Sequence, residues 1–166
     1  RTKLLDILTH DVQRIERLIT DYSQMLKDEV ALSKEQMKKL DIQPIIQSVF
    51  DDYNNIYKFK KNISINYQND GKSEYLINGI ENRIEQIIAN LLDNSISFSD
   101  DGSEVIVNVS NGLEKKVIVK ILDEGQGFKE KDTSKIFNRF YSNRPENFGE
   151  HSGLGLNIVK NLVELH

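Results

Sequence analysis

The segment 83–98, RIEQIIANLLDNSISF, constrains the fold more than any other because it predicts a single helix with two unlike faces. Its apolar residues recur at three- and four-residue spacings: Ile84, Ile87, Ile88, Leu91 and Leu92. An apolar face this broad is typical of a helix packed on a sheet. The opposite side carries amides at four-residue steps: Gln86, Asn90 and Asn94. Asn weakens a helix unless its amide has something to bind, so this row, which alone favours a solvated face, becomes informative if other binding segments accompany it.

A second amphipathic pattern covers the start of the chain. Apolar residues alternate steps of three and four over three heptads: Leu5, Leu8, Val12, Ile15, Ile19, Tyr22 and Leu26. Leu4, Leu18 and Met25 widen this stripe beyond the seam of a two-stranded coiled coil, which favours a helical hairpin or a four-helix bundle. No later segment offers a matching long helix, so we expect the partner helix to come from upstream sequence, from another subunit, or from both.

The rest of the chain alternates strand and helix patterns. We expect strands at 38–43, 63–67, 75–77, 105–109 and 117–122, a helix that opens with Pro44 in its first position, and a last helix over 156–163. The turn at Asn111-Gly112 predicts a hairpin whose two strands lie in the middle of a sheet. The polar stretch 129–151 predicts a mobile functional loop. The expected fold class is α+β, a two-layer α/β sandwich with two or three helices on one face of a mixed sheet, preceded by the long N-terminal helix.

Composition excludes several classes of function. The net charge is -4, from 22 Lys and Arg against 26 Asp and Glu, which argues against a general nucleic-acid binder. The absence of cysteine removes disulfides, thiolate metal sites and cysteine nucleophiles. No stretch reaches the roughly 18 consecutive apolar residues of a membrane span, so we expect this part of the protein to be soluble. The chain begins at Arg1 and ends within an apolar periodic run, and we expect it to be a fragment of a longer protein.

Two pairs of glycines follow the central helix. The first pair, Gly125 and Gly127, comes after the apolar strand and is preceded by Asp123. Glycines spaced by one residue permit positive φ angles and the close approach of a flat ligand. A buried carboxylate at Asp123 could then accept a hydrogen bond from an exocyclic amine such as that of adenine. Taken alone, the same pattern also fits an ordinary turn.

The second pair, Gly153 and Gly155, opens the last helix, where unpaired N–H groups and the helix dipole favour an anion such as phosphate. Among the cations of the preceding loop, we expect only Arg144 or Lys135 to contact a ligand. Asn94 offers a hard oxygen of the kind that Mg²⁺ takes beside phosphate oxygens. Base recognition, metal binding and phosphate binding would thus come from three separate elements.

Four segments, in this order, resemble the N box, the first glycine box, the phenylalanine box and the second glycine box of sensor histidine kinases of two-component systems. They are 90–94 (NLLDN), 123–127 (DEGQG), 136–141 (IFNRFY) and 153–156 (GLGL). The resemblance covers about residues 38–166 and extends to the superfamily of DNA gyrase, Hsp90 and MutL. It implies a catalytic ATP-binding domain at 35–166, truncated at its C-terminus, and the second helix of a dimerisation domain at 1–34.

The resemblance also implies the residues that bind Mg-ATP. It places Asn94 on the metal and Asp123 on adenine, and it makes the stretch 129–152 a mobile lid. The other residues that it implies in the site are Asn90, a catalytic candidate together with Asn94, and Gly125, Gly127, Phe137, Arg144, Gly153, Leu154, Gly155 and Leu156. One departure concerns Ser97 and Phe98, which stand where the family often has Lys and Tyr, so a phosphate contact from that side is in doubt.

The reaction implied is transfer of the γ-phosphoryl group of ATP to a histidine and then to an aspartate of a response-regulator receiver domain. Related ATPases carry a Glu that activates water one turn before the metal-binding Asn, whereas this chain has Asn90, which takes no proton at neutral pH. A non-transferring ATPase clamp of the same superfamily is the alternative. A purely structural coiled-coil domain would explain the heptads but not the glycine segments. The implied setting is a homodimer, joined through the N-terminal helix, on the cytoplasmic side of a membrane protein, with no nucleic acid as partner.

His10 is the candidate phosphoacceptor within the chain, because Thr9-His10-Asp11 superficially resembles the acceptor box. The family box has Pro five residues after the His, where this chain has Ile15, and only one helix follows His10 before the nucleotide domain. We therefore expect the true acceptor to lie upstream and His10 to be a surface histidine. His151 and His166 are expected to have no catalytic role.

Overall fold

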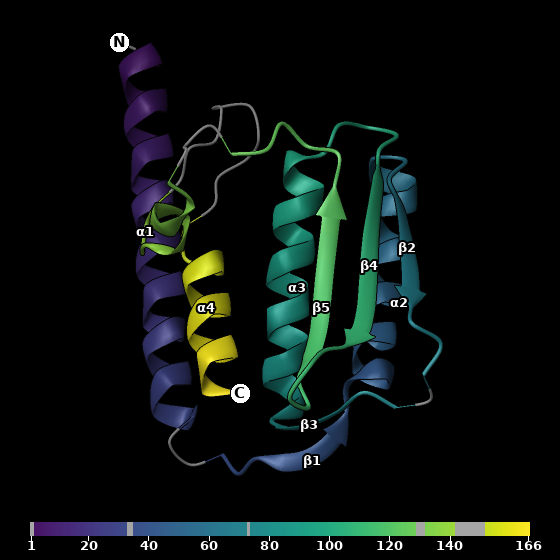
Figure 1. Ribbon diagram of the computed structural model, residues 1–166. Coiled ribbons are helices and arrows are strands. Elements are labelled where there is room, and N and C mark those ends of the chain that lie inside the picture. Colours follow the sequence, from purple (N-terminus) through teal and green to yellow (C-terminus); the bar gives the residue numbers. More distant parts are fainter. Residues whose placement is uncertain (1, 33–34, 73, 129–131, 142–151) are drawn as a thin grey trace.

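A computed structural model describes residues 2–32, 35–72, 74–128, 132–141 and 152–166 of the chain (Figure 1). A long helix comes first, and alternating strands and helices follow it. In chain order the elements are α1 (Thr2–Leu32), β1 (Lys38–Asp41), α2 (Ile42–Lys60), β2 (Ser64–Asn69), β3 (Leu76–Gly79), α3 (Glu81–Phe98), β4 (Glu104–Asn111), β5 (Val117–Asp123), the 3₁₀ helix η1 (Thr133–Phe137) and α4 (Gly155–Leu165). The fold class predicted from the sequence, α+β with a long N-terminal helix, is confirmed.

The main sheet has the strand order β2-β4-β5, with β2 parallel and β5 antiparallel to β4. β1 and β3 form a separate antiparallel pair. The hairpin of β4 and β5 was predicted to lie in the middle of a sheet, and this is correct for β4 but wrong for β5, which is an edge strand in the described part of the chain. The position matters for burial, because Val107 of β4 is fully buried while Ile121, its partner in β5, is only half-buried.

Helices α2 and α3 pack against each other and cover one face of this sheet, α2 over β2 and α3 over β5. Strand alternation turns every second residue of β4 inward, and these residues meet the apolar faces of the two helices. The fully buried side chains of this core are Ile46, Ile63, Tyr75, Ile88, Leu92, Ile96, Val105, Val107 and Val109. Figure 1 shows α4 beside α3 on the side away from α2, and α1 beyond α4.

α2 begins two residues earlier than the sequence predicted. Asp41 is the N-cap, and its carboxylate accepts a hydrogen bond from the backbone N–H of Gln43 at 3.1 Å. Pro44 is therefore the third helical residue rather than the first, and the predicted strand 38–43 ends at Asp41. Pro44 is tolerated there because the N–H groups of the first turn have no acceptor within the helix.

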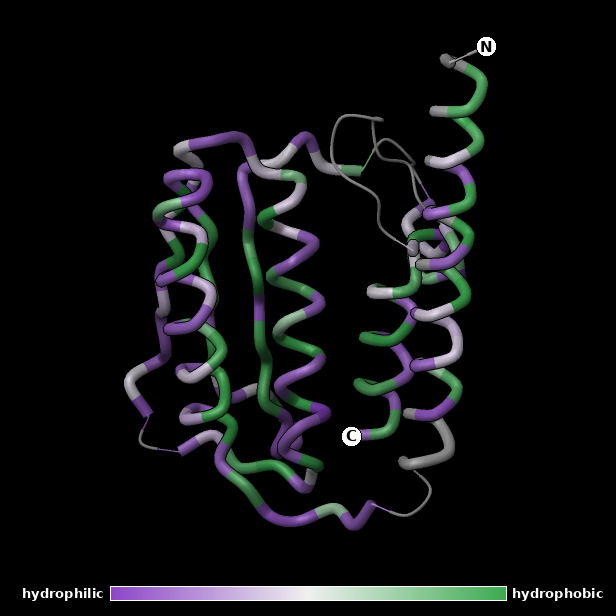
Figure 2. Tube along the Cα trace, turned by 180° about the vertical axis from the view of Figure 1, so that it is seen from behind, coloured by the Kyte–Doolittle hydropathy of each residue, from purple (hydrophilic) through white to green (hydrophobic). Residues whose placement is uncertain are grey.

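α1 keeps most of its apolar residues in solvent. Its N-terminal end projects beyond the α/β layer, and Figure 2 shows hydrophobic positions recurring along it. Met25 is buried, and the ring of Tyr22 lies 5.9 Å from the ring of Phe140, which follows η1. Among the described residues, no helix is both long enough and apolar enough to cross a membrane.

Candidate functional site

The C-terminal half of α3 carries the amides that the sequence singled out. Asn90 and Asn94 are both half-buried on this helix. Asn90 faces the start of α4, because a Cβ placed on Gly155 would lie 3.6 Å from its Oδ1 atom. Gly155 is the first residue of α4, so an amide oxygen and unpaired helix N–H groups adjoin the same point. This junction combines a hydrogen-bonding side chain with the positive end of a helix dipole.

The segment after β5 approaches the C-terminal end of α3, at Phe98. A Cβ on Gly125 would lie 2.9 Å from the carbonyl oxygen of Phe98, so only glycine fits there without displacing the backbone. Gly127 has a φ of 67°, a conformation in which glycine is favoured. The two predicted glycines thus serve different purposes, one for close packing and one for chain direction.

Asp123 differs from expectation. The sequence suggested a buried carboxylate, but the side chain is exposed at the end of β5. Its Oδ1 atom accepts a hydrogen bond from the backbone N–H of Gly125 at 2.9 Å. The reason is the edge position of β5, which leaves the end of the strand uncovered. The hydrogen bond nevertheless fixes the carboxylate at the beginning of the glycine segment.

The second glycine segment packs against the residues that follow η1. Gly153 has a φ of 71°, and a Cβ there would lie 2.8 Å from the carbonyl oxygen of Tyr141. Leu154, next to it, is almost fully buried. The described residues on the two sides of 142–151 are therefore in contact, and Leu154 anchors this junction beside the first turn of α4.

η1 is fixed at both of its ends. Asp132 caps it by accepting from the hydroxyl and the backbone N–H of Ser134, and these two hydrogen bonds, the hydroxyl first, hold the pKa of Asp132 below its ordinary value. At the other end, the carbonyl oxygen of Phe137 accepts from the side chain of Asn157 in α4 at 2.9 Å. Phe137 is thus placed by α4, the same helix that begins beside Asn90.

Asn94 lies one helical turn from Asn90 and one from Phe98, between the two glycine contacts. Its backbone carbonyl accepts from the hydroxyl of Ser97 at 2.9 Å. In the part of the chain that the structure describes, no cluster of three or more His, Asp or Glu residues could hold a metal. Asn94 has an amide oxygen, a hard ligand of the kind that Mg²⁺ takes beside the oxygens of a phosphate and waters.

One polar contact of α3 was not foreseen from the sequence. Asp93, between the site residues of the helix, lies near Tyr53 and Tyr57 of α2, whose rings stack at 5.8 Å. Burial first, and Asp93 second, raise the pKa of Tyr53, so its hydroxyl stays protonated and donates to the carbonyl oxygen of Ala89 at 3.4 Å.

The remaining candidates are distributed as follows. Leu156 is half-buried in the first turn of α4, and Lys135 is exposed in η1. Arg144, His151 and most of the predicted lid lie outside the described residues, as does the side chain of His10 in α1. The ring of His166 accepts from the backbone N–H of Ile80 at 3.1 Å and contacts the carbonyl oxygen of Leu162, which is a structural position at the end of α4.

Comparison with known proteins gives both a family and relatives. Residues 79–166, slightly more than half of the chain, match the family described as histidine kinase-, DNA gyrase B-, and HSP90-like ATPase. The sensor protein ChvG of Agrobacterium fabrum is 35% identical over 173 residues, a match that covers 100% of this chain and 29% of ChvG. The chain thus spans less than a third of the length of this relative.

Solved structures give the same fold. The catalytic domain of the histidine kinase ThkA has a TM-score of 0.66 at 22% identity, over 78% of this chain and 82% of that domain. The Acinetobacter baumannii histidine kinase AdeS has a TM-score of 0.59 at 21% identity, over 96% of this chain and 68% of that one. At such identities the likeness establishes the architecture, and the roles of single residues have to be argued from their surroundings.

Proposed function

The chain belongs to the family of histidine kinase-, DNA gyrase B-, and HSP90-like ATPases, and on this basis we propose that residues 35–166 bind Mg-ATP as the catalytic domain of a sensor histidine kinase. Residues 1–34 would be the second helix of its dimerisation domain. The observation that carries the proposal is the junction of Asn90 with Gly155, where an amide of α3 meets the N-terminus of α4. This junction offers hydrogen-bond donors and a positive dipole to the phosphates of a nucleotide.

The residues present fit such a ligand. Gly155 leaves a space beside Asn90 that a larger side chain would fill, and Gly125 lets the segment after β5 lie against the end of α3. Asn94 would hold Mg²⁺ through its amide oxygen, and Asp123, held by the N–H of Gly125, would accept from the amine of adenine. Gly127, Gly153, Leu154, Leu156, Phe137 and Arg144 complete the proposed site.

Transfer to a histidine suits these residues better than hydrolysis does. Bound ATP would supply the γ-phosphoryl group, and Mg²⁺ would offset its charge. Asn90 lies where a general base would have to be, but an amide accepts no proton at neutral pH, so Asn90 can orient a ligand without activating water. Phosphoryl transfer needs positioning and charge stabilisation above all, and the nucleophile can come from another domain.

The proposal extends to the setting of the whole protein. A response-regulator receiver domain is the proposed partner, and one structure similar to this chain is that of ThkA in complex with the response regulator protein TrrA. A second copy would pair with α1, whose apolar residues are exposed. The chain would be the cytoplasmic portion of a membrane protein, with the phosphoacceptor upstream of residue 1.

Calorimetry with three variants tests the nucleotide site. The unmodified chain is expected to release or absorb heat with Mg-ATP, and Asn94→Ala is expected to lower the Mg-dependent affinity by about 10- to 100-fold. Gln86→Ala is the matched control, because Gln86 belongs to the same amide row but bonds to Arg83. Asp123→Asn should weaken ATP far more than it weakens inorganic triphosphate. Absence of any heat with the unmodified chain would disprove the proposal.

Phosphate chemistry separates the kinase from the ATPase clamp. Incubation of the chain with labelled ATP is expected to give no free phosphate above background and no acid-labile phosphate on His10. The full-length protein is expected to gain acid-labile phosphate on an upstream histidine. Steady release of phosphate by this chain would favour the clamp, and label on His10 would show that α1 is the acceptor helix.

A further inference from the structure

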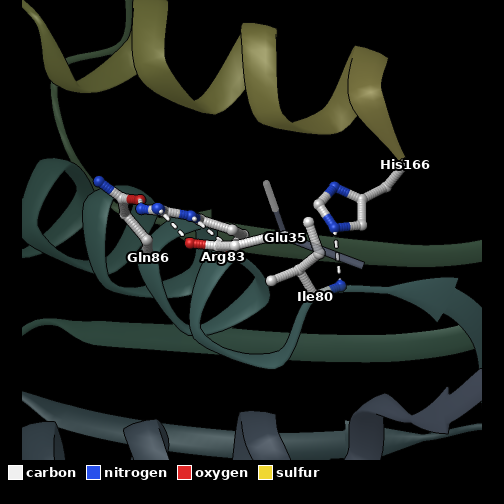
Figure 3. A network of polar contacts seen from close by, with 5 residues as sticks. All are labelled: Glu35, Ile80, Arg83, Gln86 and His166. Carbon is white, nitrogen blue, oxygen red and sulfur yellow. Dashed lines mark hydrogen bonds and ion pairs between the residues drawn. The ribbon is translucent and has the colours of Figure 1, made fainter. Parts of the chain in front are cut away.

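Arg83, in the first turn of α3, is the one charged side chain that is buried in the described part of the chain. Its side chain is only 8% exposed. The guanidinium forms a fork with Glu35, with Nη2 donating to Oε1 at 2.8 Å and Nε to Oε2 at 3.3 Å, and Nη1 donates to Gln86 at 3.2 Å. Figure 3 shows the planar group lying between its two acceptors.

A buried guanidinium stays charged, so the free energy of burying it depends on the carboxylate beside it. Removing one partner of a buried ion pair leaves the other charge without compensation, which is more unfavourable than losing an exposed pair. Glu35 is itself only 26% exposed, and its two oxygens bond to two different nitrogens of Arg83. This geometry fixes the side chain of Glu35 against the first turn of α3.

Glu35 lies at the very start of the proposed nucleotide domain, in the connection between α1 and β1. It lies three residues after the last residue of α1, Leu32, and three before the first residue of β1, Lys38. The ion pair therefore fixes residue 35 to the same helix that carries Asn90, which lies about 10 Å further along the helix axis at 1.5 Å per residue. The partners that Arg83 has in this network, Glu35 and Gln86, are not among the residues proposed to bind nucleotide.

The start of α3 also contacts the C-terminal end of the chain, at His166. The N–H of Ile80, the N-cap of α3, donates to Nε2 of His166 at 3.1 Å, and a Cβ on Gly79 would lie 2.9 Å from the same ring (Figure 3). The end of α4 and the connection after α1 thus meet at the first turn of α3. Further along α1, the ring of Tyr22 pairs with that of Phe140, and Met25 is buried.

We propose that Arg83 and Glu35 are positioning residues that set the angle between α1 and the nucleotide domain, and with it the approach of a histidine carried by the helical domain to the nucleotide. The pair joins residue 35, three residues after the end of α1, to the first turn of α3. The effect of this angle on the rate of phosphoryl transfer rests on the proposed function. The effect of the ion pair on the angle is independent of it.

The test measures the angle on the chain itself. The chain has no cysteine, so Ser23→Cys in α1 and Asn55→Cys in α2 accept two spin labels at unique, exposed places. Pulsed electron resonance then gives the distribution of distances between them. Glu35→Gln, which keeps the shape of the side chain and removes its charge, is expected to broaden and shift this distribution. Glu164→Gln is the matched control, because it removes the charge of an exposed pair with Lys160 at 3.9 Å.

Nucleotide affinity separates positioning from binding. Glu35→Gln is expected to leave the affinity for Mg-ATP within about twofold of the unmodified chain, since distant sites without shared contacts act independently. In the full-length protein the same variant should lower kcat for histidine phosphorylation while KM for ATP stays unchanged. If Glu35→Gln does not fold, Glu35→Asp, which keeps the charge but shortens its reach, is expected to shift the distances less.

An unchanged distance distribution in a folded Glu35→Gln or Glu35→Asp variant would overturn the proposal. A broadened distribution together with an equal loss of ATP affinity would also overturn it, because Glu35 would then act on the site itself. If neither the parent nor the variants bind ATP, the proposed function fails, while the distances still decide whether the ion pair sets the angle.

Discussion

α1 and α3 are both strongly amphipathic helices, yet their apolar residues differ greatly in solvent exposure. The apolar residues of α3 are buried, with Leu92 and Ile88 at 0% and 1% exposure. Those of α1 are in solvent, with Leu5 and Ile19 both at 60%. α3 packs against α2, α4 and β5, whereas α1 packs on the rest of the chain at Tyr22 and Met25 in its C-terminal half. Periodicity predicts that one face of a helix is apolar, but it does not show which segment or which chain packs against that face.

The polar faces differ as well. On α3 the polar side is divided, since Gln86 bonds to Arg83 at one end and Asn90 meets Gly155 further along. The polar residues of the buried helix α3 thus make specific contacts, while the apolar residues of α1 are exposed in the single chain. The two helices therefore predict different consequences for substitutions of the same kind.

The largest difference is expected for leucine truncation. Leu92→Ala removes a fully buried side chain and is expected to lower the free energy of unfolding by about 2–5 kcal/mol. Leu8→Ala, the matched change at a residue that is 51% exposed, is expected to cost less than about 0.5 kcal/mol. Urea denaturation of both variants gives the two values. Equal losses would mean that α1 is covered within the isolated chain and would abolish the contrast.

Much of this contrast could be predicted from the sequence. The spacing of Ile84, Ile88 and Leu92 predicted a helix packed on a sheet, and the heptads of the N-terminal region predicted a long helix, both of which the structure has. That the partner of this long helix lies outside the chain stays a prediction. The second glycine pair was expected to open the last helix, and Gly155 is the first residue of α4. These features depend on local pattern, which a single sequence carries in full.

Features that depend on contacts distant in sequence were missed. The exposure of Asp123 follows from the edge position of β5, and strand order is not encoded in the alternation of one strand. Arg83 looked like an ordinary residue at a helix start, and nothing near it in sequence indicated Glu35, 48 residues earlier. The contact of Asp93 with Tyr53 was hidden in the same way, because each residue fits its own helix without the other.

A second, smaller effect concerns association of α1. Ile15→Lys places a charge in the exposed apolar stripe, at a residue 55% exposed in the single chain. The fold should be unaffected, but self-association through α1 is expected to weaken by at least about tenfold, since a buried Ile contributes about 1.5–3 kcal/mol. Sedimentation of the chain over a range of concentrations measures the dimerisation constant.

Glu16→Lys is the matched control for this prediction, because Glu16 is exposed next to Ile15 but outside the heptad positions. It should change dimerisation much less than Ile15→Lys does. Loss of thermal stability at low concentration in Ile15→Lys would contradict the prediction, since it would mean that Ile15 supports the single chain. A dimer with unchanged affinity would show that a second copy covers some other face.

The smallest expected effect is on pH dependence and belongs to the α/β layer. Asp70, between β2 and β3, accepts from the hydroxyl of the buried Tyr75 at 2.6 Å and from the N–H of Asn111 at 2.9 Å, and these bonds, Tyr75 first, lower its pKa. A carboxyl group whose pKa is lower in the folded state stabilises the fold above its unfolded pKa of about 3.9, and this contribution is lost as the pH falls through the folded value. Asp70→Asn should therefore lower Tm at pH 7, and the difference from the unmodified chain should shrink below about pH 4. Tyr75→Phe, which removes only the hydroxyl, should reproduce part of the change in Tm. If the Tm difference between Asp70→Asn and the unmodified chain stays constant from pH 7 to pH 3, the hydrogen bonds of Asp70, rather than its charge, stabilise this turn.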